Sequence, residues 1–294
     1  MSDELSGVAV VGSVNLDLVV EVSRPPRIGE TLLGRAGGRF AGGKGLNQAV
    51  AAARSGAPTR FCGVVGTDEG AGLLERTLVD AGVTSALRRS DTAPTGVAHV
   101  LALEGGDNSI IVAAGANAEL SPEDAVAGVS GAAVVLAQLE VPVPAVSAAL
   151  RAARDAGATT VLNAAPAHAA TLGLLERVDV LVVNETECAE LGGIDLLHRA
   201  GAATVVLTRG AGGVDLHRTG RPVVHVEAFR IDPVDTTGAG DAFCGALAGA
   251  LARRVPVEDA LALACAAGAI VALHRGATTP ALTPEALAEL TATR

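Results

Sequence analysis

The sequence has very few aromatic side chains: it contains no tryptophan, no tyrosine and four phenylalanines among 294 residues. Aromatic rings are the surfaces on which proteins stack nucleobases and sugar rings. Their scarcity argues against a pocket built on base stacking. A nucleoside is therefore a disfavoured substrate for any enzyme with this sequence.

Positive charge is also scarce. The chain has 22 basic and 32 acidic residues, a net charge of −10, and no basic tract. Such a balance repels phosphate backbones, so we expect no nucleic-acid partner. Lys44 is the only lysine, and the other 21 basic residues are arginines. One compact ammonium in an arginine-rich set suggests a site that needs it.

Cysteine pairs and long hydrophobic runs are missing as well. Cys62, Cys188, Cys244 and Cys265 are widely spaced inside apolar segments, which indicates buried thiols rather than disulfides or a zinc site. No run of about 18 apolar residues suits a membrane span. The acidic start Met1–Glu4 is unlike a secretory signal. We expect a cytoplasmic protein that does not enter membranes.

What the sequence does contain is an alternation of short apolar runs and helical segments. Val8–Val11 has the form of a buried first strand. Further strands are predicted at Phe61–Val65, Ala133–Leu139, Val161–Leu162, Val178–Val183 and Thr204–Leu207, and helices at Asp68–Asp80, from Ser121 onward, at Pro256–Leu273 and at Thr283–Leu290. This pattern is typical of a doubly wound αβα sandwich with a mainly parallel sheet.

Two stretches depart from that pattern. Leu18–Val22 with Thr31–Leu33, and Gly96–Leu103 with Ser109–Val112, are alternating strand pieces without helices, and Glu104–Asn108 resembles a hairpin turn. We predict a small β-sheet lid of residues 17–38 and 94–113, beside a main domain of residues 1–16, 39–93 and 114–294. Val100 and Ile111 could bury a dimer face or cover a ligand.

Polar residues recur where the predicted strands end. Asn15 and Asp17 follow the first strand, and Glu140, Asn163, Asn184 and Thr208 follow later ones. Ligands bind at the carboxyl ends of parallel strands, so these positions predict one active-site edge. Asn15 and Asp17, two residues apart, could grip a polyol together, although an Asx turn would use the same residues.

The stretch Asp235–Asp241 is the strongest single signal. Small residues lie between an extended run, Val223–Val226, and a helix predicted at Ala242–Ala252, where backbone N–H groups and the helix dipole can bind an anion. Gly238 and Gly240 would permit close approach, and Asp241 could act as a base. Acidic residues in a first helical turn are also favourable for the dipole alone.

A second glycine-rich stretch leads into an alanine-rich helix at Ala49–Arg54. Gly38 and Gly43-Lys44 have nearly the spacing of a P-loop, but the magnesium-binding Ser or Thr is replaced by Gly45. We therefore interpret it as a Gly-Gly turn at a helix N-terminus. Its N–H groups, with Lys44 and Asn47, could bind hydroxyls or a transferring phosphoryl group.

Two further segments allow two interpretations each. Asn184 and Glu187 lie one turn apart and could face hydrated magnesium, or could simply cap a helix. The loop Thr208–Gly213 suits nucleotide phosphate, or merely a tight turn.

Together these motifs resemble the ribokinase family of sugar kinases, and the similarity runs from about Val8 to Ala277. It rests on Gly12-Ser13-x-Asn15-x-Asp17, Gly42-Gly43-Lys44-Gly45-x-Asn47-Gln48-Ala49, Gly115-Ala116-Asn117, Gln138-Leu139-Glu140, Asn184-Glu185-Thr186-Glu187 and Asp235-Thr236-x-Gly238-Ala239-Gly240-Asp241. The resemblance implies a lid that mediates dimerisation. It also implies transfer of the γ-phosphoryl group of ATP to the 5-hydroxyl of D-ribose.

The resemblance also implies roles for individual residues. Asp241 is implied as the base and Gly238, Ala239 and Gly240 as the anion hole. The implied sugar contacts are Asn15, Asp17, Gly42, Gly43, Lys44, Asn47, Glu140 and Asp241, and the implied ATP contacts are Asn184, Thr208, Arg209, Gly210, Ala211, Gly212, Gly213, Gly240 and Cys265. Glu187 would face Mg²⁺ through water. Asp235, Thr237, Val271, His274 and Gly276 would form an activating K⁺ site, near which Pro280 replaces a small polar residue.

Other functions stay open at this point. A kinase of the same family could act on 2-deoxyribose, another sugar or a nucleoside. A non-catalytic sugar-binding protein would be expected to have lost Asp241 or an anion-hole glycine, and both are present. A dehydrogenase is disfavoured because no Gly-x-Gly-x-x-Gly follows the first strand.

Overall fold

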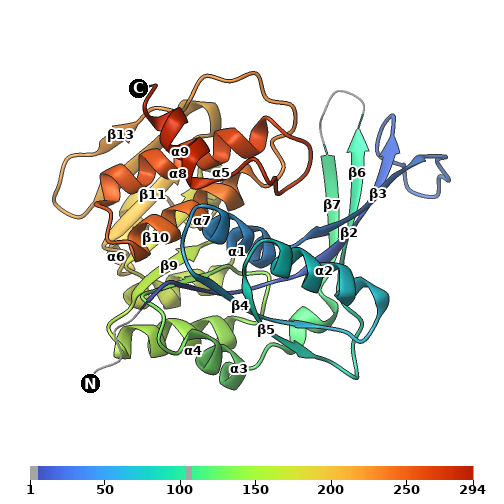
Figure 1. Ribbon diagram of the computed structural model, residues 1–294, viewed down its shortest axis with the longest axis horizontal. Helices are drawn as coiled ribbons and strands as arrows, with labels where there is room; N and C mark the ends of the chain where they lie inside the picture. The colour runs from blue at the N-terminus through green and yellow to red at the C-terminus, as the bar shows by residue number, and fades with distance from the viewer. Residues whose placement is uncertain (1–5, 104–107, 294) are drawn as a thin grey trace.

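The computed structural model describes residues 6–103 and 108–293, in which nine strands form one large sheet (Figure 1). Its order is β13-β12-β11-β10-β9-β8-β1-β4-β5. The strands are β1 Val8–Val11, β4 Thr59–Val65, β5 Thr84–Arg89, β8 Val134–Ala137, β9 Thr159–Asn163, β10 Val180–Asn184, β11 Thr204–Thr208, β12 Val214–Arg218 and β13 Val224–Val226. All neighbours pair in parallel except at β12 and β13, which add antiparallel to one edge.

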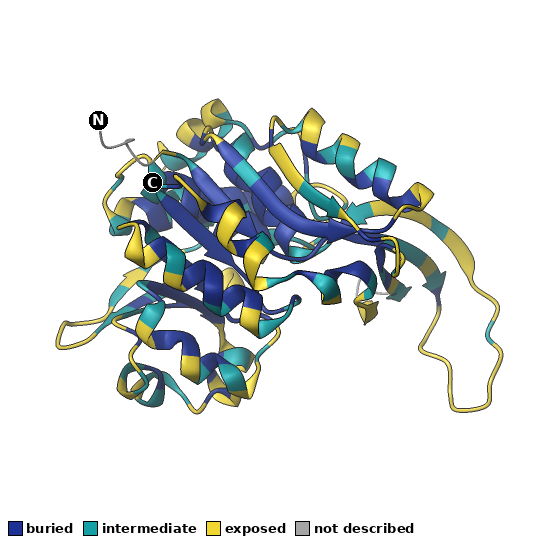
Figure 2. Ribbon diagram, turned by 90° about the horizontal axis from the view of Figure 1, so that it is seen from below, coloured by how far each residue is buried: buried dark blue, intermediate teal, exposed yellow. Residues whose placement is uncertain are grey.

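Helices cover both faces of this sheet, which confirms the predicted αβα sandwich. One face packs against α3 Pro122–Val129, α4 Val143–Asp155, α5 Glu185–Glu190 and α6 Ile194–Arg199. The other packs against α1 Lys44–Arg54, α2 Glu69–Asp80, α7 Ala239–Ala252 and α8 Val257–Ala272, with α9 Pro284–Thr291 beside α8. Figure 2 shows the sheet strands buried between helices that expose their outer sides.

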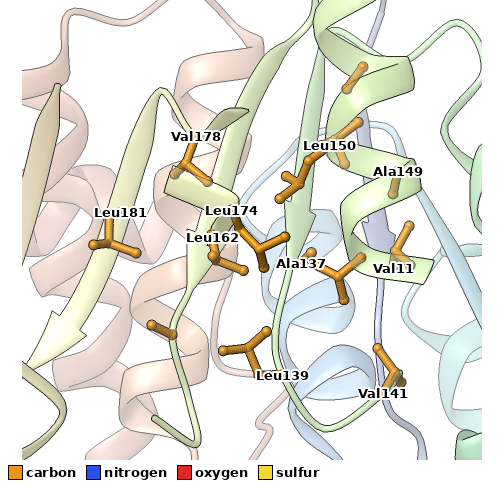
Figure 3. Packing of buried hydrophobic residues seen from close by; sticks show 14 of the residues in the cluster. Val11, Ala137, Leu139, Val141, Ala149, Leu150, Leu162, Leu174, Val178 and Leu181 are labelled. Atoms are coloured by element: carbon orange, nitrogen blue, oxygen red, sulfur yellow. The ribbon is translucent and has the colours of Figure 1, made fainter. Parts of the chain in front are cut away.

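Strand alternation accounts for the two packed layers. Ala9 and Val11 lie in one core cluster, and Val8 and Val10 lie in the other. Figure 3 shows Val11 in the first cluster, together with Leu150 of α4 and Leu162 of β9. Each fully buried leucine of this kind contributes roughly 1.5–3 kcal/mol of hydrophobic stabilisation. The core thus fixes the strand ends that carry the polar residues.

A separate four-stranded sheet of order β3-β2-β6-β7 extends from one side of the molecule (Figure 1). Its strands are β2 Asn15–Val22, β3 Arg35–Gly42, β6 Gly96–Leu103 and β7 Asn108–Ala113. This confirms the predicted small sheet. Most of the predicted turn between β6 and β7 lies outside the described residues.

Several predicted boundaries were wrong. Thr31–Leu33 is not a strand, and the strand is the glycine-rich Arg35–Gly42, which no apolar alternation marks but which pairs with β2. The predicted lid limit at residue 38 therefore falls inside a strand. Helix α7 begins at Ala239 rather than Ala242, so Asp241 is helical, and residues 227–238 separate it from β13.

Candidate active site

Asp241 lies in the first turn of α7, where glycines shape the approach. The N-cap residue Gly238 has φ +75°, and a Cβ there would lie 2.4 Å from the carbonyl oxygen of Ala277. Gly240 instead faces open space, since an added Cβ would meet no atom within 4 Å. The turn therefore needs glycine at 238 for its backbone conformation, and it is open to a ligand at 240.

The N–H groups of this turn are only partly used. The Ala239 N–H donates to the Thr236 carbonyl oxygen at 3.2 Å, so it is engaged within the turn. Among the described residues, the N–H groups of Gly240 and Asp241 have no hydrogen-bond acceptor. Two donors at the positive end of a 14-residue helix are thus available to an anion.

Two amides from α1 hold the Asp241 carboxylate. Asn47 Nδ2 donates to Oδ2 at 3.1 Å, and Gln48 Nε2 donates to Oδ1 at 2.9 Å. Asp241 is 8% exposed, so it is almost entirely shielded from solvent. Because both oxygens have fixed donors, the carboxylate has one orientation before any ligand binds.

A second acid, Asp17, lies close enough to Asp241 for their charges to interact. Burial, and then the charges of Glu140 and Asp241, raise the pKa of Asp17 to about 7. Asp17 Oδ1 is buried without a hydrogen-bond partner among the described residues. A Cβ on Gly42 would lie 2.2 Å from Asp17 Oδ2, so any larger residue there would displace the Asp17 carboxylate. Asn15 is buried and accepts a 2.7 Å hydrogen bond from Asn117 Nδ2.

Lys44 is placed among these carboxylates. The charge of Asp241 contributes most to raising the Lys44 pKa, against a smaller lowering by burial, and Glu140 and Glu187 add to the effect. Glu140 Oε2 accepts from Ser13 Oγ at 2.5 Å and from the Lys44 N–H at 3.3 Å. The single ammonium of the chain therefore lies at the candidate site.

The predicted nucleotide side is built differently. Asn184 and Glu187 form a capping box: Asn184 Oδ1 accepts from the Glu187 N–H at 2.8 Å, and Glu187 Oε2 accepts from the Asn184 N–H at 2.9 Å. The capping interpretation is thus confirmed, while a magnesium role stays a prediction. Burial raises the pKa of Glu187.

The loop after β11 is exposed. Thr208 pairs in register with Asn184, which places the two strand ends side by side. Gly210–Gly212 form a single 3₁₀ turn, and Arg209 forms ion pairs with Asp215 at 3.0 Å and Glu185 at 3.3 Å. Cys265 lies on α8, partly buried against the core rather than in this loop.

The residues predicted for the potassium site are brought together only in part. Asp235 Oδ1 accepts from the Thr237 N–H and Oδ2 from the Gly276 N–H, both at 2.9 Å. The His274 ring instead contacts the Ile270 carbonyl oxygen at 2.8 Å, and the Val271 carbonyl accepts the His274 N–H. Among the described residues, no group of three or more His, Cys, Asp or Glu side chains could hold a metal ion.

The structure also brings in Ser13, Gln48, Asn117 and Gln138, for which the sequence predicted no individual role, and it places Asn163, which was predicted for this edge, beside Gln48. A compositional signal could have found them. The chain has only two glutamines, Gln48 and Gln138, and Gln138 Nε2 donates to Gln48 Oε1 at 2.6 Å. Five of the six asparagines also lie around the site, at 15, 47, 117, 163 and 184.

No helix in residues 6–103 and 108–293 has the length and apolar character to cross a membrane.

Comparison with known proteins agrees with this geometry. A family model described as pfkB family carbohydrate kinase matches residues 6–284. The chain is similar to a ribokinase of Staphylococcus aureus (strain COL), 39% identical over 259 residues that cover 81% of this chain and 84% of that protein. It is also similar to a ribokinase of Haemophilus influenzae, 34% identical over 284 residues that cover 91% and 92%.

Among solved structures, the fold is similar to that of Arabidopsis thaliana ribokinase complexed with ribose and ATP. The TM-score is 0.88 at 32% sequence identity, and the match covers 97% of this chain and 98% of that chain.

Proposed function

The chain belongs to the pfkB family of carbohydrate kinases, and from this premise we propose that it transfers the γ-phosphoryl group of ATP to the 5-hydroxyl of D-ribose. The observation that carries the proposal is the pairing at the start of α7. A buried carboxylate, Asp241, lies beside two N–H groups without acceptors. That is a base next to an oxyanion-stabilising site.

Our proposed mechanism uses these groups in turn. Asp17, Asn15 and Glu140 bind hydroxyls of the sugar, and the absence of a side chain at Gly42 leaves room for the Asp17 carboxylate. Asp241 accepts the proton of the attacking hydroxyl. The N–H groups of Gly240 and Asp241, with the Lys44 ammonium, stabilise the negative charge that spreads over the transferring group.

The proposed nucleotide contacts are Asn184, the loop Thr208–Gly213, Gly240 and Cys265. Among the described residues, the N–H groups of Gly210 and Ala211 have no acceptor, and such donors suit phosphates. The Arg209 guanidinium already bridges two carboxylates, so it contributes by holding the loop rather than as a free cation.

The residues present fit a magnesium ion held indirectly. Glu187 uses one carboxylate oxygen for its capping bond, which leaves the other for a water of a hydrated ion. When bound with the nucleotide, magnesium neutralises phosphate charge.

The fit to potassium is weaker. The two carboxylate oxygens of Asp235 accept hydrogen bonds from the N–H groups of Thr237 and Gly276. Each oxygen can still accept a further contact. The Val271 carbonyl is engaged within its helix end. A monovalent cation at Asp235 would add positive charge near the turn that carries the anion site.

We further propose that the small sheet acts as a lid and mediates a homodimer. By strand register, Phe40, Ala98 and Val112 lie on the same face as Asp17, and Phe40 and Val112 are exposed. The part of this apolar face that is nearest to the large sheet can cover the sugar. The part farther out can contact a second subunit. We also propose a cytoplasmic location, because ATP is the proposed phosphoryl donor.

The test is ADP release by the purified protein with ATP and magnesium, with and without potassium. The acceptors are D-ribose, 2-deoxyribose, fructose 6-phosphate and adenosine. We expect strong release with ribose. Release with 2-deoxyribose alone would reassign the acceptor within the family, and no release with any acceptor would favour the non-catalytic sugar-binding alternative.

A further inference from the structure

A chain of buried amides lies behind the Asp241 carboxylate. Gln48 Nε2 donates to Asp241 Oδ1 at 2.9 Å and to Asn163 Oδ1 at 3.1 Å, while Gln48 Oε1 accepts from Gln138 Nε2 at 2.6 Å. Asn163 Nδ2 in turn donates to the Val182 carbonyl at 3.4 Å. The chain joins α1 and α7 to the ends of β8 and β9.

These bonds allow only one orientation of the Gln48 amide. If the amide turned over, its oxygen would face the oxygens of Asp241 and Asn163, and its NH₂ group would face that of Gln138. Each contact would replace an attraction by a repulsion. The Asn163 orientation is fixed by Val182, and the Gln48 orientation is fixed from the other side by Gln138.

Neither glutamine can touch a substrate, because both are 0% exposed. Gln138 is enclosed so closely that a Cβ on Gly12 would lie 1.8 Å from its Oε1. Burying two amides is costly unless they are needed, and Gln138 Oε1 has no partner in the part of the chain that the structure describes. Within the described residues, the bond from Gln48 to Asp241 links both glutamines to the proposed base.

We infer that Gln48 and Gln138 are positioning residues for the base: Gln138 fixes the Gln48 amide so that it always donates to Asp241. This inference rests on the proposed function, in which Asp241 takes the proton of the acceptor hydroxyl. The amide holds Oδ1, Asn47 holds Oδ2, and the remaining lone pairs point to the substrate. A misplacement of about 1 Å can lower a rate about a hundredfold.

Three variants test the inference by their order of effect. Gln48→Glu keeps the shape but places a second carboxylate against Asp241, Gln48→Met removes the donor, and Gln138→Met frees Gln48 to turn over. We expect kcat to fall about a hundredfold in Gln48→Glu, by less than that in Gln48→Met, and about tenfold in Gln138→Met. The KM for ribose should stay within about threefold of wild type in all three variants. A merely structural role predicts instead that kcat per folded molecule stays near wild type in all three variants and that only the melting temperature falls.

The pH profile is the second readout. Lys44, Asp17, Glu187 and Cys244 are the other titratable groups that interact with Asp241, and the variants leave all of them in place. In Gln48→Glu the added charge favours the protonated base, so the acid limb of kcat should move to higher pH by about one unit.

The matched control is Thr160→Val, at the opposite end of β9. Thr160 is also fully buried, and its Oγ1 donates to the Arg177 carbonyl at 2.8 Å. This variant should melt at a lower temperature with the kcat and pH profile of wild type. The inference is overturned if kcat in the glutamine variants falls only in proportion to melting temperature, or if the pH limb does not move.

The wild-type protein in the same assay separates the two hypotheses. If wild type does not phosphorylate ribose, the proposed function fails, and carbon-13 NMR of the aspartate carboxylates then tests the amide chain alone, with Asp241→Asn assigning the signal. The Asp241 carboxylate signal should change its chemical shift in Gln48→Met, which has lost the amide donor, and stay unchanged in Thr160→Val. Identical signals in Gln48→Met and wild type would overturn the positioning role.

Discussion

The two halves of the candidate site are built on different principles. On the acceptor side, Asn15, Asn47 and Asp241 are all buried, and each is held by side-chain hydrogen bonds. On the nucleotide side, Asn184 and residues 209–212 are exposed, and they are held by the α5 cap, a single 3₁₀ turn and the ion pairs of Arg209. The first half is fixed by packing between helices, and the second by local backbone structure.

This difference indicates where precision matters. A base must lie within hydrogen-bonding reach of one hydroxyl, and burial with two amide donors supplies that order before the sugar arrives. Phosphates accept bonds from many directions, so exposed N–H groups of a short loop suffice. We therefore expect acceptor-side changes to alter turnover or sugar binding strongly, and nucleotide-side changes to alter ATP binding modestly.

The largest effect should come from Asp241→Asn. The amide cannot accept the hydroxyl proton, so kcat should fall about two to four orders of magnitude while the KM for ribose changes little. Steady-state ADP release checks this. The matched control is Asp195→Asn, which changes an exposed acid in the first turn of α6 and should leave kcat unaltered. Near wild-type turnover of Asp241→Asn would remove this residue from the base role.

The next effect concerns sugar binding. Gly42→Ala would place a methyl group 2.2 Å from Asp17 Oδ2, so the carboxylate must move. The KM for ribose should rise at least about tenfold, with the KM for ATP within about twofold. Gly72→Ala is the control, because its Cβ would make only an ordinary 3.4 Å contact with Arg76. Equal effects on both KM values would contradict the division between the two halves.

Asp17 should also couple the acceptor side to stability. Its folded-state pKa of about 7 lies above the ordinary value of 3.8, so the folded protein holds this proton more tightly than the unfolded chain does. The resulting stabilisation is complete below the ordinary value and is lost as pH rises through 7. Asp17→Asn removes the charge that causes this loss. Without ligands, the variant should melt about 3 °C or more above wild type at pH 8 and near wild type at pH 4.

Thermal melts between pH 4 and pH 8 check this prediction, with Glu69→Gln, at an exposed acid in the first turn of α2, as the control. The same melting difference at both ends of the pH range would show that Asp17 acts through packing rather than charge. The prediction sharpens the comparison because it assigns an electrostatic cost to one named carboxylate on the acceptor side.

The fold and most of the edge of the site could be predicted from the sequence. Buried strands such as Val8–Val11 are marked by apolar runs, and parallel strands end at one edge, so Asn163, Asn184 and Thr208 could be placed together. The wrong boundaries occur where pairing overrides local pattern. Arg35–Gly42 contains three glycines and becomes a strand only because β2 lies beside it.

The contacts behind the site could not be predicted in the same way. Gln48 and Gln138 are 90 residues apart, and nothing in either local sequence indicates that their amides meet. Their orientation depends on how α1 packs against α7 and the strand ends, which is a property of the assembled core. The same holds for the raised pKa of Asp17, which arises from burial and from carboxylates on other elements.

The smallest effect tests the nucleotide side with a pair of equivalent caps. Asn184 caps α5 and Ser121 caps α3, each in a capping box with an acid three residues later. Replacing either by alanine should cost about 1 kcal/mol of stability, because one helix N–H loses its acceptor. Only Asn184→Ala should also raise the KM for ATP, by about threefold to tenfold, since only Asn184 lies beside Thr208 at the sheet edge. Denaturant unfolding and steady-state kinetics on both variants measure the two effects. If the KM for ATP responds equally in both, the cap at Asn184 serves folding alone, and the nucleotide must bind elsewhere along the edge.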